Sequence, residues 1–197
     1  MKTLLVTAAL AASFVAPAAA QAQAIPGAIV AVVDLDQVSS DCNACKTAAN
    51  ALRSQATAQE NREKALITPL QTEEKAIRDA AAALNGKEPD AALQARAKAF
   101  QTKYESAQQE SAKGRAQLQA NATYVQKQIR DKLNPIYSSV MQKRGANLLV
   151  EIGTTLATAQ SLDVTADVLA ALNASLPSIS VNAPAPAAST TTKPQGR

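Results

Sequence analysis

The sequence predicts an α+β protein, mostly α, in which a long antiparallel coiled-coil hairpin is inserted into a small β body. Two features predict this fold. Ala-rich heptad patterns run into and out of a turn-forming segment at 85–90, and β-rich apolar runs lie just outside them. Aromatic residues make up only 3% of the 197-residue chain. With so few large side chains for a monomeric core, we expect copies of the chain to associate.

Residues 1–24 have the pattern of a secretory signal peptide. Lys2 supplies positive charge, residues 3–15 form an apolar stretch, and small residues follow. Overlapping Ala-x-Ala patterns place the cleavage site between residues 20 and 24. Because the apolar stretch is too short to span a bilayer, we expect an exported protein that works in a bacterial periplasm.

Residues 41–145 are predicted to form the hairpin arm, with its tip near 85–90. Asp41 is the expected N-cap of the first helix, which would begin near Cys42. Gly145 ends the second helix after a basic last turn. The positions expected along the seam between the helices, at 3-4 spacing, are Ala49, Leu52, Ala56, Gln59, Glu63, Leu66, Leu70, Glu73, Ile77, Ala80 and Leu84, then Leu93, Ala97, Phe100, Tyr104, Ala107, Ser111, Gly114, Leu118, Asn121, Val125, Ile129, Leu133, Ile136 and Val140.

This seam is poorly suited to tight packing. Ala, Ser, Gly and Asn occupy positions where a rigid coiled coil has Leu or Ile. Pro69 removes a backbone hydrogen bond inside the first helix and should kink it. Gly114 lies about two helical turns from the residues expected to face Pro69. We therefore expect Pro69 and Gly114 to make the middle of the arm flexible; the alternative is a local kink without a mechanical role.

The β body is predicted to comprise residues 28–40 and 146–176. Residues 28–34 and 147–152 are continuous β-rich apolar runs, and residues 154–159 form a weaker third strand. The arm is therefore inserted between the first strand and the second. A three-stranded sheet with exposed edges is marginal alone and pairs readily with other chains.

A short helix is expected after the strands, at 166–173, with Thr165 as its N-cap. Beyond it, residues 177–197 are rich in Pro, Ala, Ser and Thr, and this composition predicts a disordered tail. The residues expected to join copies of the chain all lie in the apolar strands. They are Ile29, Val30, Val32, Leu148, Leu149, Val150 and Ile152.

The composition argues against several classes of function. The chain has no His, which removes imidazole bases, Ser-His-Asp triads and His-based metal sites. The sequence shows no Gly-rich nucleotide-binding loop. The formal net charge is only +4, and along the arm basic residues alternate with acidic ones. We therefore expect no catalytic activity, no cofactor and no nucleic acid partner.

The order of motifs around the arm is the most specific feature of the sequence. The strand at 29–34 leads through a loop to Lys-Thr-Ala-Ala at 46–49, which opens the arm. Ile-Arg-Asp-Lys-Leu-Asn-Pro-Ile at 129–136 and Lys-Arg-Gly-Ala-Asn-Leu-Leu-Val at 143–150 close it, and the helical segment 163–173 follows. Over roughly residues 28–176, this arrangement resembles the OmpH/Skp family of periplasmic chaperones.

The resemblance implies a homotrimer in which the β bodies form an intersubunit barrel and three arms enclose a cavity. It also implies an ATP-independent holdase that binds unfolded outer-membrane β-barrel proteins and prevents their aggregation. Client contacts would be diffuse over the inner arm surface. A lipopolysaccharide-binding patch has been associated with the family, which would add peripheral contact with lipopolysaccharide or the membrane. The alternatives are a structural or adaptor coiled coil of the cell envelope and a CxxC oxidoreductase.

Cys42 and Cys45 form a CxxC motif at the entrance to the arm. A haem attachment motif requires His at the next position, which is Lys46. A zinc site requires two further ligands, which symmetric chains would have to supply. In an oxidising periplasm we expect a disulfide within the motif. Bonds between chains and redox or metal chemistry are the alternatives.

Overall fold

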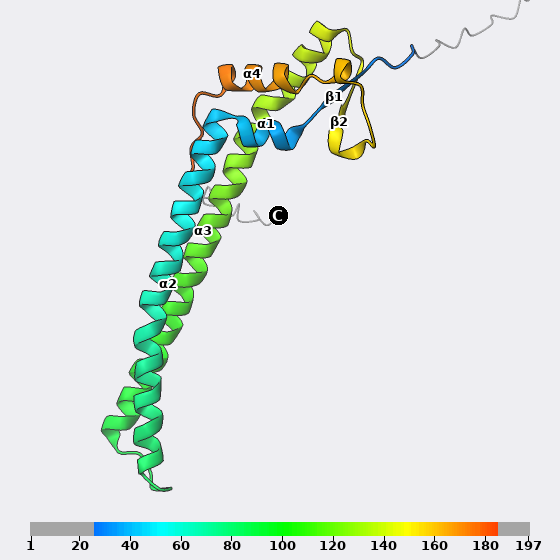
Figure 1. Cartoon of the computed structure of the whole chain (residues 1–197). Helices are drawn as coiled ribbons and strands as arrows, with labels where there is room; N and C mark the ends of the chain where they lie inside the picture. The colour runs from blue at the N-terminus through cyan, green and yellow to red at the C-terminus, as the bar shows by residue number, and fades with distance from the viewer. Residues whose placement is uncertain (1–25, 185–197) are drawn as a thin grey trace, which may run out of the picture.

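Two long helices dominate the structure (Figure 1). Helices α2 (Asn43–Ala83) and α3 (Ala91–Arg144) are 41 and 54 residues long and lie side by side in opposite directions. The shorter elements gather into a body at one end. The computed structural model describes residues 26–184, so the predicted signal peptide and residues 185–197 lie outside the described part. The prediction of a mostly helical protein with a small set of strands is confirmed.

The turn between the long helices lies at 84–90, as predicted. Asn85 and Gly86 both adopt positive φ angles, 49° and 86°, a conformation that glycine and asparagine tolerate best. Asp90 is the N-cap of α3, and its Oδ1 accepts a hydrogen bond from the main-chain N of Leu93 at 2.8 Å. Local sequence therefore fixes both the reversal of the chain and the start of the second helix.

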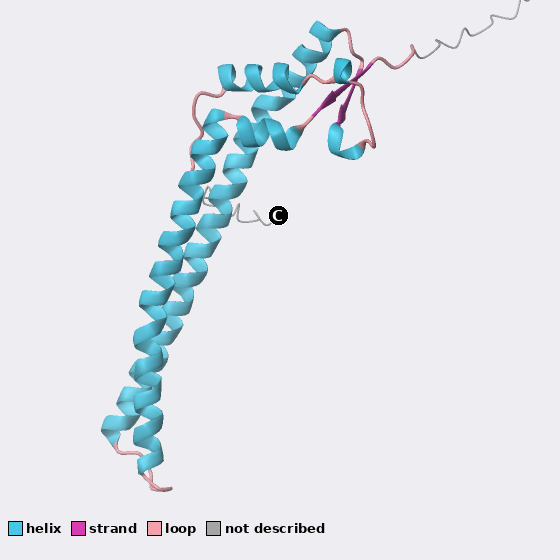
Figure 2. Ribbon diagram, in the orientation of Figure 1, coloured by secondary structure: helices cyan, strands magenta, loops and turns pink. Residues whose placement is uncertain are grey.

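The sheet consists of two parallel strands, which Figure 2 shows together at one side of the body. Strand β1 (Val30–Val33) pairs with β2 (Leu148–Glu151), with Val30 opposite Leu148. Parallel neighbours require a crossover connection, and here the whole arm is that connection. On its other edge, β1 accepts a hydrogen bond at Val32 O from the N of Val164 at 2.9 Å.

The predicted third strand at 154–159 is wrong. The chain instead forms two short 3₁₀ helices, η1 (Ile152–Thr154) and η2 (Gln160–Leu162). The hydroxyls of Thr154 and Thr155 donate to the main-chain oxygens of Glu151 and Ile152, both at 2.8 Å. Such local side-chain bonds compete with a sheet ladder, and the edge position beside β1 goes to residue 163 instead.

A helix that the sequence did not predict follows β1. Helix α1 (Leu35–Asp41) begins because Asp34 is its N-cap, with Oδ1 accepting from the N of Gln37 at 2.7 Å. Asp41 ends this helix, so the prediction that it caps the arm helix is wrong. Cys42 caps α2 instead.

Helix α4 (Thr165–Ser175) covers the body and contains the predicted helix. The prediction of Thr165 as its N-cap is wrong, because Thr165 is the first residue of the helix and Val164 is at the N-cap, without a side-chain hydrogen bond. The Thr165 N donates to Asp163 Oδ1 at 2.8 Å. The Thr165 hydroxyl instead accepts from the N of Asp34 at 2.9 Å. One threonine therefore ties the end of β1 to the start of α4.

The core lies in the body, where β1, α1, α4 and the base of α3 meet. The side chains that are fully buried there are Leu172, Val32, Val38, Val168 and Cys42. Val38, Cys42, Val168 and Leu172 belong to one core cluster with Ala31 and Val33 of β1 and with Leu133, Ile136 and Val140 of α3. The long helices leave it as a pair whose contacts are described below.

The buried face of α3 follows the predicted seam positions. The buried residues of this helix are Ala107, Ser111, Asn121, Val125, Leu133, Ile136 and Val140. Near the base of α2, the buried face is shifted by one residue from the predicted seam positions, because Ala44 and Cys45 pack into the body core. Ala48 is therefore buried, whereas the predicted seam residues Ala49 and Ala56 are exposed.

Candidate functional site

Polar side chains cross the interface between α2 and α3. Glu63 accepts hydrogen bonds from the Nε and Nη2 of Arg115 at 2.7 and 3.2 Å, and Glu73 accepts from Arg96 at 2.6 and 2.9 Å. The hydrogen bonds from Arg115, with a further one from Gln59, lower the pKa of the Glu63 carboxyl. The hydrogen bonds from Arg96 lower the pKa of Glu73. Bidentate pairs of this kind fix the register of the two helices.

Apolar packing along the arm is sparse. Outside the core cluster of the body, the buried apolar side chains of the described arm are Ala48, Leu70, Ala107 and Val125. Ser111 is also buried, and its Oγ has no hydrogen-bond partner within residues 26–184. An unsatisfied buried hydroxyl is unfavourable, so the middle of the arm is less well packed than an ordinary helix interface.

Pro69 and Gly114, the predicted points of flexibility, lie in different surroundings. Helix α2 continues through Pro69, which is exposed, to the buried Leu70. Gly114 lies directly beneath the side-chain amide of Gln59, and a Cβ at that position would collide with it. The glycine therefore allows the Gln59 side chain to lie across α3.

The strand residues predicted to join copies of the chain fall into two groups. Ile29 and Leu148 lie at the start of the strand pair and are 58% and 45% exposed. Val30, Leu149 and Val150 are half-buried, whereas Val32 is 1% exposed and already belongs to the core of its own chain. Ile152 lies beyond the end of β2, in η1. We call the two exposed apolar residues at the start of the strand pair, Ile29 and Leu148, the apolar margin. The strands do not present a complete apolar face.

A hollow of about 370 Å³ lies beside the exposed face of β2. Tyr137 and Met141 of α3 line it together with Leu35 and the residues of β2. Burial raises the pKa of the Tyr137 hydroxyl, and the nearby Glu151 carboxylate adds to the shift. The hollow continues the apolar margin of the strands toward the long helix.

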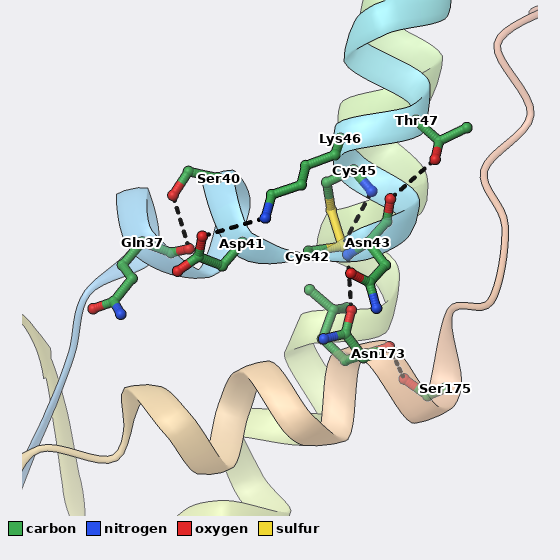
Figure 3. Close-up of a disulfide and its surroundings, with 11 residues drawn as sticks. Gln37, Ser40, Asp41, Cys42, Asn43, Cys45, Lys46, Thr47, Asn173 and Ser175 are labelled. Atoms are coloured by element: carbon green, nitrogen blue, oxygen red, sulfur yellow. Dashed lines mark hydrogen bonds and ion pairs between the residues drawn. A yellow bond between two sulfur atoms is a disulfide. The ribbon is translucent and has the colours of Figure 1, made fainter.

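A disulfide joins Cys42 and Cys45 at the corner between α1 and α2, as Figure 3 shows. The sulfur of Cys42 also accepts a hydrogen bond from the N of Cys45 at 3.2 Å. Asn173 of α4 approaches the same corner, and its Oδ1 accepts from the N of Asn43 at 2.9 Å. The first turn of the arm is thus held to the body from two sides.

The segment after α4 differs from its predicted disorder. Residues 177–184 turn back along the arm (Figure 1) and form hydrogen bonds with it, and Ile179 packs against the body core. The composition of this segment is typical of disorder, but its residue pattern is not. Ser178 to Asn182 alternate polar and apolar residues, which is the signal of an extended chain with one face against a surface.

The described residues show no metal site and no membrane helix. Within residues 26–184, no three Cys, Asp or Glu side chains lie close enough together to hold a metal ion. In the same range, no helix combines the length and the apolar character needed to cross a bilayer. The described residues instead provide extended surfaces that could bind another molecule. These are the long sides of the arm, the groove between its helices and the apolar margin of the body.

Comparisons with known proteins agree with this architecture. The family model described as outer membrane protein (OmpH-like) matches residues 29–172. A crystal structure of an OmpH-like protein from Caulobacter crescentus, for which a role as an outer membrane chaperone has been suggested, superimposes with a TM-score of 0.64 at 19% sequence identity. The match covers 81% of this chain and 90% of that one. A search of curated proteins found no match.

Proposed function

The chain belongs to the OmpH-like family of outer membrane proteins, and from that premise we propose that it is an ATP-independent holdase chaperone. It binds unfolded outer-membrane β-barrel proteins in the periplasm and prevents their aggregation. Residues 1–24 direct its export and are removed. The protein acts by binding alone, without catalysis or a cofactor.

The observation that supports this proposal most directly is the construction of the arm. Two helices of 41 and 54 residues extend from the body. Exposed ion pairs, rather than a packed apolar core, make up much of the contact between them. Unfolded clients present no fixed geometry, so a surface that binds them must adapt and must offer many weak contacts. A loosely packed helix pair meets both requirements, with Pro69 and Gly114 as the points at which it bends.

The charge of the arm supports capture of acidic chains. Residues 46–135 contain fifteen Lys and Arg against ten Asp and Glu, a net charge of +5. The attraction is diffuse, because these charges alternate along the helices. Exposed charges are screened within about 8–10 Å near physiological ionic strength, so capture should slow as salt is added.

We propose further that three chains assemble through their bodies, so that the strand pairs close an intersubunit barrel. The exposed Ile29 and Leu148 and the hollow beside β2 are the surfaces such a barrel would cover. With three bodies joined, the arms extend from one end and enclose the space in which a client is held. A two-stranded sheet alone is marginal, which gives the assembly its driving force.

Light scattering tests the holding activity. An outer-membrane β-barrel protein is diluted from urea into buffer with the full chain or with a variant whose arm lacks one heptad in each helix, residues 77–83 and 91–97. This deletion retains the turn at 84–90 and shortens the arm by about 10 Å at 1.5 Å per residue. The full chain should suppress scattering, and the short-armed chain should fail first with the largest clients. Lys87→Ser, at the tip, is the control that keeps the arm length.

Equal protection by the full and the short-armed chains would place the binding surface outside the arm. No protection by either would contradict the chaperone proposal and favour the envelope adaptor. Sedimentation equilibrium measures the oligomeric state in a separate experiment. Leu148→Asp should dissociate the trimer into folded monomers, whereas Leu84→Asp, at the far end of the arm, should leave it intact. A wild-type chain that stays monomeric at micromolar concentration would contradict the assembly.

A further inference from the structure

Three amide side chains on the arm bind the main chain of the segment that follows α4. We call Gln55 of α2 and Asn121 and Gln128 of α3 the amide row. Gln128 binds Ser180 at both of its main-chain groups: the Ser180 N donates to Gln128 Oε1 at 3.0 Å, and Gln128 Nε2 donates to the Ser180 O at 2.8 Å. This pair of bonds imitates the contact between neighbouring strands of a sheet.

The other two members of the row continue the same contact. Asn121 Oδ1 accepts from the N of Ala183 at 2.9 Å, and Asn121 Nδ2 donates to Gln55 Oε1 at 2.9 Å. The side-chain nitrogen of Gln55, Nε2, donates to the main-chain O of Val181 at 3.4 Å.

Contacts within the arm also orient the row: Gln128 Nε2 donates to the main-chain O of Tyr124 at 3.2 Å, and Asn121 Oδ1 accepts from Gln117 Nε2 at 2.9 Å. With the Asn121–Gln55 bond, the row is preorganised apart from the bound segment.

The spacing of the row matches an extended polypeptide. Gln128 and Asn121 are two helical turns apart, which is about 10.5 Å along the helix axis. Ser180 and Ala183 are three residues apart, which is about 10 Å in an extended chain. An extended chain laid along α3 can therefore meet both of these amide side chains, which lie seven helical residues apart.

These contacts are largely independent of sequence. The row binds main-chain N–H and C=O groups, which every residue except proline possesses. One side chain takes part, since Gln55 Nε2 also lies 3.2 Å from Asn182 Oδ1. A different extended segment could keep the main-chain bonds and lose only this one.

Space for a longer segment continues beyond the row. A groove of about 390 Å³ begins beside Asn182 and Asn121 and is lined farther toward the tip by Gln59, Arg62 and Gly114. Within the described residues, which end at 184, the chain does not follow this groove. Ala183 and Pro184 lie instead against a separate hollow on the Ala116 and Ala120 side of α3.

We propose that the amide row is a binding site for extended polypeptide backbone, which residues 179–183 occupy in cis and a segment of a client chain can replace. The nature of the client rests on the proposed function; the site itself does not. Because the cis segment is tethered to α4, its effective concentration at the row is high. It therefore competes with any client for the same amides.

Changes in the cis segment and changes in the amide row should affect client binding differently. The double variant Ser180→Pro/Ala183→Pro, in the full chain, removes two N–H donors from the cis segment and leaves the row intact. Gln128→Leu removes from the row itself the amide that binds Ser180. Gln126→Leu, an exposed position on α3 outside the row, is the matched control.

Two measurements separate the outcomes. In the wild type and the control, the amides of Ser180 and Ala183, which donate to Gln128 and Asn121, should be protected from hydrogen exchange. Gln128→Leu should lose that protection at Ser180; the double proline variant lacks both amides and is compared by client binding alone. Binding of a fluorescent, urea-unfolded outer-membrane β-barrel protein should tighten about tenfold in the double proline variant, since two hydrogen bonds of the competitor are gone. It should not tighten in Gln128→Leu.

The inference is overturned if residues 177–184 exchange freely in the wild type, or if all four proteins bind the probe equally. Reduced, carboxymethylated α-lactalbumin, which stays unfolded, is the second probe. If it follows the expected order of affinities while no protein binds the barrel probe, the amide row stands and the outer-membrane client is wrong. If the barrel probe is held equally by all four, the holdase stands and the amide row is not its binding site.

Discussion

The body and the arm of this chain are held together by different kinds of contact. In the body, Val32, Val38, Val168 and Leu172 are fully buried and come from β1, α1 and α4. In the described arm, the three ion pairs that cross between the helices have arginine side chains that are 44%, 65% and 69% exposed. Fully burying one such apolar side chain contributes about 1.5–3 kcal/mol, whereas exposed ion pairs contribute little.

This difference assigns the two regions different tasks. The body has one well-determined packing, which suits a unit that must present the same edge to every copy of itself. The arm is fixed in register by its ion pairs but weakly held between them. Stability in this molecule is therefore concentrated where assembly is expected, and adaptability where clients are expected.

Introducing a charged side chain should give the largest difference in stability between the body and the arm. Val32→Asp places a carboxylate in the body core, where an unpaired charge costs several kcal/mol (about 3–5), and the body should unfold. Leu118→Asp, at a half-buried seam position of the arm, should cost far less because water reaches the site. Circular dichroism melting of both variants checks this, and similar melting temperatures would remove the distinction between body and arm.

A smaller difference is expected from truncating leucine. Leu172→Ala leaves a cavity at a site with 0% exposure and should cost about 3 kcal/mol or more. Leu70→Ala, at 8% exposure in the arm, should cost about 2 kcal/mol or less, since the sparse surroundings can relax. Urea denaturation of the two variants measures both values. A larger cost at Leu70 would mean that the arm has a true core.

Removing the disulfide at the junction should have a modest effect. Cys42→Ser/Cys45→Ser opens a very short loop, so the expected loss of stability is about 2 kcal/mol or less. The serine hydroxyl at position 42 can still accept the hydrogen bond that caps α2. Mass spectrometry of the wild type should find both cysteines joined within one chain. Loss of holding activity in the double variant would show that the bond does more than pin the junction.

The smallest effect concerns the Glu63 carboxyl in the arm. Its pKa is lowered from the ordinary value of 4.5 by hydrogen bonds from Arg115 and Gln59. The stabilisation is therefore present above pH 4.5 and is lost as the pH falls through the lowered pKa. Glu63→Gln should melt slightly below the wild type at neutral pH and match it near pH 2. A difference in melting temperature that grows as the pH falls would contradict this prediction.

The sequence was most informative where structure is local. The buried face of α3, the turn at 84–90 and the Gly145 helix end depend on residues close in the chain, and each is where the pattern placed it. At the base of α2, where the body core intervenes, the buried face is offset by one residue. The body was predicted less well, because its contacts join distant segments. The Thr165 hydroxyl accepts from Asp34, 131 residues away, and no local signal shows that bond. The same holds for the parallel pairing of β1 and β2, and for the amide row, whose partner segment looked disordered by composition.

Native-state hydrogen exchange of the intact protein compares the two regions directly. We predict that the main-chain amides of Val168 and Leu176, bonded within the body at 3.0 and 2.8 Å, exchange only through global unfolding. Amides of the arm between residues 60 and 115 should exchange at least about tenfold faster, through local opening. Uniform protection along body and arm would contradict this division, because it would show one cooperative unit rather than a stable base with an adaptable arm.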